Sequence, residues 1–197
     1  MMDYIWLVPA FPLMGFVLNG LFGRSHLRAR AHWVAVPAAG LSFVVALLIS
    51  LPVFRGPTLE VTLYPWVVAG KFQAPIGFLV DPLSTVMMLT VTFVGFLIHV
   101  YSIGYMHGDP GYPRFFAYLN LFMFAMLILV LANNYLLLFL GWEGVGLCSY
   151  LLIGFWYEKK TATDAGNKAF LVNRVGDAGF LLGLFLLWST FGTLEYG

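Results

Sequence analysis

The sequence has little of what catalytic and redox chemistry uses. It holds one cysteine, Cys148, four histidines and only 10% charged residues, against about 25% in a typical soluble domain. A lone cysteine forms no internal disulfide and no CxxC metal or cluster motif. Only His99 lies within an apolar stretch, which argues against a bis-histidine haem. With no glycine-rich phosphate loop and no hydrolase motif, we predict no catalytic residue, metal or cofactor on this chain.

An excess of positive or negative charge is also lacking. The formal net charge of the 197 residues is +1, which gives no basic footprint for nucleic acid. The first residues, MMDYIWLVPAFP, carry Asp3 and no basic segment, so we expect no signal peptide. What the chain has is apolar side chains, at 61% of residues with a mean hydropathy of +0.88. This composition predicts an all-α polytopic membrane protein.

Six apolar stretches are long enough to cross a hydrocarbon core as helices, which takes about 20 residues. They are Tyr4–Phe22, Trp33–Phe54, Val80–Tyr101, Phe115–Ala132, Tyr135–Tyr157 and Ala169–Phe191. We therefore divide the chain into two N-terminal spans in residues 1–54, a loop in residues 55–79 and four spans in residues 80–197.

The long loop has its own pattern. TLEVTLYPW alternates apolar and polar residues, VAGK offers a turn, and FQAPIGFLV follows. This predicts a short β-hairpin, with an irregular loop as the alternative.

Basic residues favour one set of loops. Arg24, Arg28 and Arg30 follow the first span, Arg114 follows the third, and Lys159, Lys160 and Lys168 follow the fifth, whereas the other side has only Arg55 and Lys71. The positive-inside rule then places these three loops in the cytoplasm. We expect a multi-pass protein of the cell inner (plasma) membrane with its N-terminus, hairpin and C-terminus on the outer side.

Glu143 is a carboxylate in the middle of the fifth span. It lies eight residues after Tyr135, so about 12 Å into the membrane at ~1.5 Å per residue. Membrane-insertion scales assign a free-energy cost of about 2.5–3.5 kcal/mol to a charged side chain at this depth. Glu143 is therefore a functional-site candidate. Desolvation favours the neutral form of a carboxyl and a nearby cation favours the ionised form, so a balanced carboxyl can carry protons. The alternative is a neutral Glu that only packs helices.

The sixth span adds Asn173, Arg174 and Asp177, which share a helix face at i+3 and i+4 spacing. Two interpretations are equally open. Arg174 and Asp177 form a salt bridge that only supports packing, or they act as a charge switch beside a proton path. Glycines at 141 and 144 with Cys148, and those at 176, 179 and 183, form two small-residue stripes suited to helix contact.

Three further residues have simpler interpretations. Asp81 before Pro82 is typical of a helix cap. His99 is a weaker proton-path candidate, since a buried, hydrogen-bonded histidine explains it as well. Lys168 is another weak candidate that can also extend to the interface.

Four motifs together resemble one family. VDPLS, HVYSIGYMHGDPGYPRFFAYLNLF, NNYLLLFLGWEGVGLCSYLLIGFWY and KAFLVNRVGDAGF look like the N-terminal part of subunit L of respiratory complex I. The WE pair is shared with the wider family of antiporter-like subunits, including Mrp-type sodium/proton antiporters. NRVGD and the HGDPGYPRFFAYLNLF segment point more narrowly to subunit L.

The resemblance implies an antiporter-like inverted-repeat fold, proton translocation and membrane-subunit partners. NADH, FMN, iron–sulfur clusters and quinone would belong to other subunits. Glu143 would be the family's membrane glutamate, paired with a lysine on a later broken helix, and Arg174 and Asp177 would modulate that pair. That lysine would lie downstream of residue 197. An Mrp-type cation/proton antiporter subunit, or a fragment with only a structural role, is the alternative.

Overall fold

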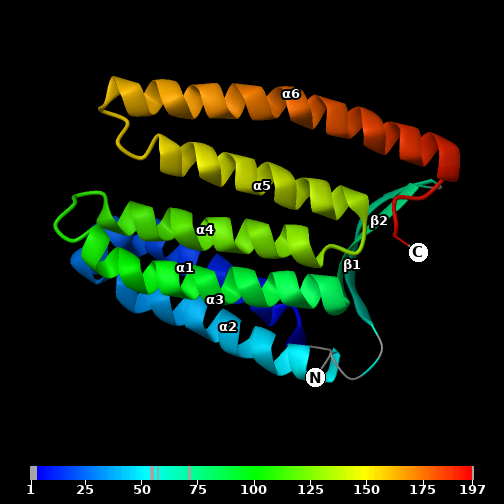
Figure 1. Cartoon of the computed structure of the whole chain (residues 1–197), viewed down its shortest axis with the longest axis horizontal. Coiled ribbons are helices and arrows are strands. Elements are labelled where there is room, and N and C mark those ends of the chain that lie inside the picture. Colours follow the sequence, from blue (N-terminus) through cyan, green and yellow to red (C-terminus); the bar gives the residue numbers. More distant parts are fainter. Residues whose placement is uncertain (1–3, 54–55, 57, 71, 197) are drawn as a thin grey trace.

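The computed structural model describes residues 4–53, 56, 58–70 and 72–196. Helices account for most of them, as α1, α2, α3, α4, α5 and α6, with a short irregular helical link, η2 and η3, after α1 (Figure 1). Their bounds are α1 Leu7–Phe22, η2 Gly23–Leu27, η3 Arg28–Arg30, α2 His32–Val53, α3 Pro82–Tyr105, α4 Tyr112–Leu131, α5 Tyr135–Ile153 and α6 Lys160–Phe191. The described chain has six helical spans long and apolar enough to cross a membrane, the first running from Leu7 to Arg30 through α1, η2 and η3, which confirms the predicted fold class.

A β-hairpin separates the second and third spans, as the alternating pattern predicts. Strands β1 (Leu59–Ala69) and β2 (Phe72–Val80) pair antiparallel, with Ala69 opposite Phe72. Gly70 in the turn has φ +62°, a conformation that glycine adopts without steric cost. Lys71, like Arg55 of the predicted outer side, lies outside the described residues.

The helices form a bundle with an extension on one side. Helix α1 packs against α2 and α4, α3 packs against α2 and α4, and α5 lies against α4. Helix α6 lies beyond α5 at the edge (Figure 1). The main apolar core joins Val8, Ala39, Met88 and Leu127 across α1 to α4. Helix α6 therefore presents most of its surface outside this core.

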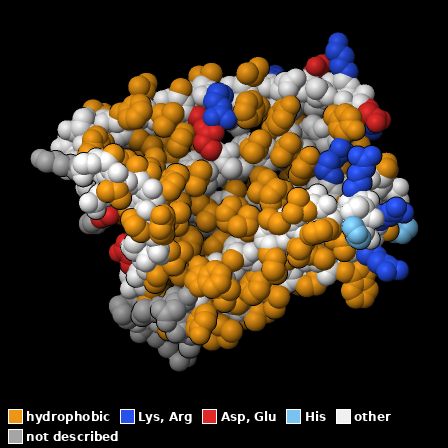
Figure 2. All heavy atoms as spheres, turned by 180° about the vertical axis from the view of Figure 1, so that it is seen from behind, with side chains coloured by type: hydrophobic (Ala, Val, Ile, Leu, Met, Phe, Trp, Pro, Cys, Tyr) orange, Lys and Arg blue, Asp and Glu red, His pale blue; other side chains and the backbone are white. Residues whose placement is uncertain are grey.

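The two ends of the bundle differ. The hairpin and both chain ends lie at one end, and the α1–α2, α3–α4 and α5–α6 connections lie at the other (Figure 1). Basic side chains gather at the end away from the hairpin (Figure 2). Successive connections in the described chain thus alternate between the two ends of the bundle, as they must when each helix crosses a membrane once.

Helix α6 starts earlier than predicted. It begins at Lys160 rather than Ala169 and has 32 residues, so it is about 48 Å long at ~1.5 Å per residue. That exceeds a hydrocarbon core of about 30 Å, so its polar first turns can extend into water, where polar side chains cost nothing. Lys168, expected at a helix start, consequently lies within α6.

Candidate functional site

Helix α5 carries Glu143 on a rigid support. Asn134 caps the helix, since its Oδ1 accepts from the backbone N of Leu137 at 2.9 Å. A Cβ placed on Gly141 would lie 2.5 Å from the backbone N of Leu129, and one on Gly144 would lie 2.9 Å from Ala125. These glycines allow α5 to approach α4 closely, as the small-residue stripe predicts. Cys148, the third member of that stripe, is fully buried.

Arg174 of α6 joins two carboxylates. Its Nη1 donates to Oε2 of Glu143 at 2.5 Å, across the α5–α6 interface. Its Nε lies 3.8 Å from Oδ2 of Asp177, one turn further along α6. The predicted Arg174–Asp177 pair is therefore the longer of two contacts, and the main partner of Arg174 is Glu143. Spacing within one helix could not show this, because the closer carboxylate comes from the neighbouring helix.

Two aromatic residues complete this network. The indole Nε1 of Trp142 donates to Oδ1 of Asp177 at 2.8 Å. The guanidinium carbon of Arg174 lies 4.8 Å from the centre of the Phe170 ring, within the range of a cation–π contact. Asp177 is thus held by α5 and α6 together. Neither aromatic residue was predicted as part of the site, although an indole N–H at membrane depth needs an acceptor and was a usable signal in the sequence.

Burial within the network is graded. Asp177 is 6% exposed, while the side chains of Glu143 and Arg174 are 22% and 47% exposed. Charged side chains at this depth do not face lipid by preference. A pair of opposite charges is visible amid a largely hydrophobic surface (Figure 2). This face is open in the described chain.

The other candidates do not join the network. Asn173 is exposed and makes no side-chain hydrogen bond within the described residues. Lys168 is exposed, and no carboxylate of the described chain lies within 4 Å of it. His99 is buried in the α1–α4 bundle, where its Nδ1 donates to the carbonyl of Gly95 at 2.7 Å and its ring lies 6.3 Å from that of Phe116. The structure thus brings together Glu143, Arg174 and Asp177.

The second small-residue stripe behaves differently from the first. A Cβ on Gly176, Gly179 or Gly183 would meet no atom of the described residues within 4 Å. The helix contact that this stripe predicts is not made within the described part of the chain, because α6 is the outermost helix. Gly146, beside Glu143, also has open space around it.

Metal-binding geometry offers no competing explanation in the part of the chain that the structure describes. No three side chains among its His, Cys, Asp and Glu residues cluster closely enough to hold an ion. The acidic residues of the network instead have a guanidinium and an indole as partners. Within this arrangement the side chain of Glu143 is more exposed than that of Asp177.

Two family models match this chain. Residues 66–116 match the N-terminus of NADH-ubiquinone oxidoreductase (complex I) chain 5, and residues 132–196 match the transmembrane domain of NADH:quinone oxidoreductase/Mrp antiporter proteins. NADH-quinone oxidoreductase subunit L of Mycobacterium tuberculosis is 48% identical over 98% of this chain. NADH-ubiquinone oxidoreductase chain 5 of Metridium senile is 42% identical over 96%. The chain covers 31% and 32% of these two proteins, so it spans about a third of their length.

Solved structures share the fold. A chain of the Mrp complex from Dietzia sp. DQ12-45-1b superposes with a TM-score of 0.78 at 26% identity, over 97% of this chain and 20% of that one. A chain of the membrane-bound sulfane sulfur reductase, an archaeal respiratory membrane complex, gives a TM-score of 0.77 at 18% identity over 97% of this chain and 38% of that one. The latter likeness concerns the fold alone.

Proposed function

Because this chain belongs to the family of complex I subunit L and chain 5 and spans about a third of the length of such relatives, we propose that it is part of a proton-translocating membrane subunit of NADH:quinone oxidoreductase. Glu143 carries the proton within this chain. NADH, FMN, iron–sulfur clusters and quinone belong to partner subunits, and this chain contributes no redox chemistry. Its partners are the other membrane subunits and the bilayer.

The observation that supports this proposal is the position of Arg174 between two carboxylates. One cation within reach of Glu143 on α5 and Asp177 on α6 can exchange its closer partner by a side-chain rotation. Asp177 is held by Trp142, so it stays in place while Arg174 moves. A fixed acid, a movable cation and a half-buried second acid are the parts of a charge switch.

The switch changes how readily Glu143 takes up a proton. While Arg174 lies against Glu143, the two opposite charges are paired across the α5–α6 interface. When Arg174 turns to Asp177, Glu143 loses this partner and is free to pair with another group. In this proposal the position of one guanidinium therefore decides when Glu143 passes its proton on.

The open side of this network is covered by the remainder of the subunit. The chain spans about a third of its relatives, and charged groups at membrane depth face protein or water rather than lipid. The lysine expected on a later broken helix would approach Glu143 from this side. Asn173, exposed beside Arg174, lines the same path, while Lys168 and His99 lie apart from it and are secondary candidates.

The basic end of the bundle faces the cytoplasm in this proposal. Arg24, Arg28 and Arg30 belong to the α1–α2 connection, and Lys159 and Lys160 lie at the α5–α6 connection. Both connections lie at the end opposite the hairpin (Figure 1). The membrane is the inner (plasma) membrane of the cell, and the N-terminus and hairpin lie on its outer side.

Glu143→Gln in the full-length subunit is the direct test. The amide keeps the shape of the side chain but cannot carry a proton, so proton pumping in proteoliposomes should fall at least several-fold while the complex still assembles. Glu158→Gln, at an exposed loop position, is the matched control and should pump normally. Normal pumping by an assembled Glu143→Gln complex would show that Glu143 is not the carrier.

An Mrp-type antiporter subunit is the second candidate, favoured by the superposition on a chain of the Mrp complex at 26% identity. Such a subunit would move protons against another cation without redox coupling. Sodium-dependent proton movement in the absence of NADH would support this candidate. A chain that only supports assembly would instead leave both activities unchanged in the Glu143→Gln variant.

A further inference from the structure

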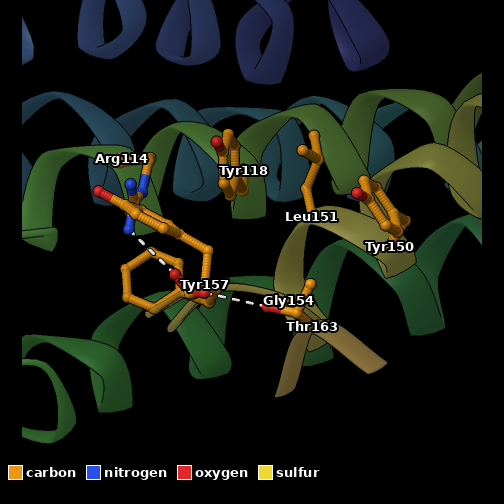
Figure 3. Close-up of a pocket in the computed structure, with 8 residues that line it drawn as sticks. Arg114, Tyr118, Tyr150, Leu151, Gly154, Tyr157 and Thr163 are labelled. Carbon is orange, nitrogen blue, oxygen red and sulfur yellow. Dashed lines mark hydrogen bonds between the residues drawn. The ribbon is translucent and has the colours of Figure 1, made fainter. Parts of the chain in front are cut away.

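A second polar site lies at the basic end of the bundle, away from Glu143. A cavity of about 170 Å³ opens where the start of α4, the end of α5 and the start of α6 meet (Figure 3). Arg114 and Tyr118 come from α4, Tyr150 and Leu151 from α5, and Thr163 from α6. Three helices and one arginine thus define a cavity to which the proposed proton path assigns no role.

Arg114 is held in place without a carboxylate. Its Nη2 donates to the carbonyl of Phe155 at 3.0 Å, and its guanidinium carbon lies 4.7 Å and 4.9 Å from the ring centres of Phe155 and Tyr157. Its Nε is buried and has no hydrogen-bond partner in the described chain. A carbonyl and two rings orient a guanidinium but do not neutralise its charge.

The nearest acidic residue along the chain is already engaged. Oδ1 of Asp109 accepts from the backbone N of Gly111 at 2.7 Å, and its Oδ2 accepts from the indole of Trp156 at 3.0 Å. Glu158 and Asp164 are exposed and do not line the cavity. No carboxylate of the described residues lies within 4 Å of Arg114. Arg114 therefore forms no ion pair within this part of the chain, and its guanidinium can donate hydrogen bonds to an anion that enters the cavity.

The rest of the lining suits a lipid. Tyr118, Tyr150 and Tyr157 provide amphipathic rings, and Leu151 and Phe155 provide apolar surface. Aromatic residues of this kind are enriched where a membrane meets water, and the cavity lies at the ends of three membrane-crossing helices. A free anion in water would gain nothing from such an apolar lining.

We propose that this cavity binds the phosphate of an anionic phospholipid. Arg114 binds the phosphate oxygens, because a guanidinium donates two parallel hydrogen bonds to a phosphate. The glycerol and first acyl carbons lie along Leu151 and the tyrosine rings. Basic pockets between membrane helices are known to take lipid headgroups in this way. The lipid then bridges α4 to the α5–α6 connection.

Lipid add-back to the purified full-length protein tests this proposal. Delipidated protein is titrated with phosphatidylglycerol, and bound lipid is counted by native mass spectrometry. Arg114→Gln should weaken one binding event about tenfold, since a charge-assisted hydrogen bond is lost. Arg24→Gln removes an exposed basic residue at the same end and should bind as the unchanged protein does. Phosphatidylcholine with the same acyl chains should bind more weakly.

Two further arms keep the outcome decisive. Leu151→Trp fills the cavity but leaves Arg114 in place, so it tests the site even if Arg114→Gln misfolds. It should lower phosphatidylglycerol binding to a similar extent. If Arg114→Gln and Leu151→Trp, or whichever of them folds correctly, bind phosphatidylglycerol as the unchanged protein does, the proposal is overturned. Displacement of the lipid by millimolar inorganic phosphate would also overturn it, because the site would then select a free anion rather than a phospholipid.

Discussion

At the scale of the residue, the partner of a charge decides its role. Arg174 is three residues from Asp177 in the sequence, yet its closer contact is with Glu143, 31 residues away. The indole N–H of Trp142 donates a hydrogen bond to the other oxygen of Asp177. The helical spacing placed Arg174 and Asp177 on one face correctly. The rank order of the two contacts follows from how α5 and α6 lie against each other.

A double-mutant cycle should reproduce this order. Arg174→Ala leaves Glu143 without its cation, so it should lower the melting temperature of the full-length protein. Adding Glu143→Gln should recover part of that loss, with a coupling of about 1–2 kcal/mol, because the stranded charge is removed as well. Adding Asp177→Asn instead should recover less, since in the Arg174→Ala variant Asp177 still accepts the hydrogen bond from Trp142 and had only the longer contact to lose. If Glu143→Gln and Asp177→Asn recovered the same amount of stability, Glu143 would not be the main partner of Arg174.

At the scale of the element, glycines decide which helices come close. Gly141 lies against the backbone of α4 near Leu129, whereas Gly146, one and a half turns later, faces open space. Both residues belong to the same glycine-rich segment of α5. Close approach to α4 holds the helix that carries Glu143.

Gly141→Ala should therefore destabilise the protein by several kcal/mol. Its new methyl group would overlap backbone atoms of α4, which cannot rotate away, so α4 and α5 would have to separate. Gly146→Ala is the matched control, and it should be neutral or stabilising by up to about 1 kcal/mol, since alanine favours helices. Thermal unfolding of both variants in detergent checks this. Equal effects would mean that α5 does not depend on this contact.

Helix α3 depends on its cap, as the sequence predicts. The side chain of Asp81 accepts from the backbone N of Ser84 at 2.7 Å, and the backbone N of Asp81 donates to Oγ of Ser84 at 2.8 Å, which confirms the predicted cap. Asp81→Ala should cost about 1 kcal/mol of stability and leave proton pumping intact. Asp81→Asn keeps an accepting oxygen and should cost less. A pumping defect in Asp81→Ala at normal assembly would assign this residue more than a capping role.

At the scale of the whole molecule, the two ends have different chemistry. The hairpin and the chain ends lie at one end and the basic connections at the other (Figures 1 and 2). Contact between Phe72 of β2 and Trp188 of α6, with ring centres 4.8 Å apart, joins the hairpin to the last helix. This asymmetry is the basis for orienting the protein in a membrane.

Labelling with a membrane-impermeant maleimide tests that orientation. In a Cys148→Ser background, Tyr64→Cys places a thiol on the exposed hairpin and Ser25→Cys places one in the basic α1–α2 link. In intact cells the first should react and the second should not. After permeabilisation both should react, which is the control for accessibility. The reverse pattern would invert the assigned topology.

The sequence by itself determined the class of the protein. Apolar length alone predicted six spans, because a helix must satisfy its backbone within itself to cross lipid. Strand alternation predicted the hairpin, and Asp81 before a proline predicted the cap of α3. These features depend on neighbours along the chain. Local physical chemistry was therefore sufficient for them.

Only the tertiary structure decided the partners. The Glu143–Arg174 contact, the indole of Trp142 on Asp177 and the bond from Arg114 to the carbonyl of Phe155 all depend on which helices lie side by side. The same holds for the two glycine stripes, of which one meets α4 and the other meets no described residue. Helix packing joins residues that are far apart in the sequence, and helical periodicity gives the face of a residue but not the neighbour that this face meets.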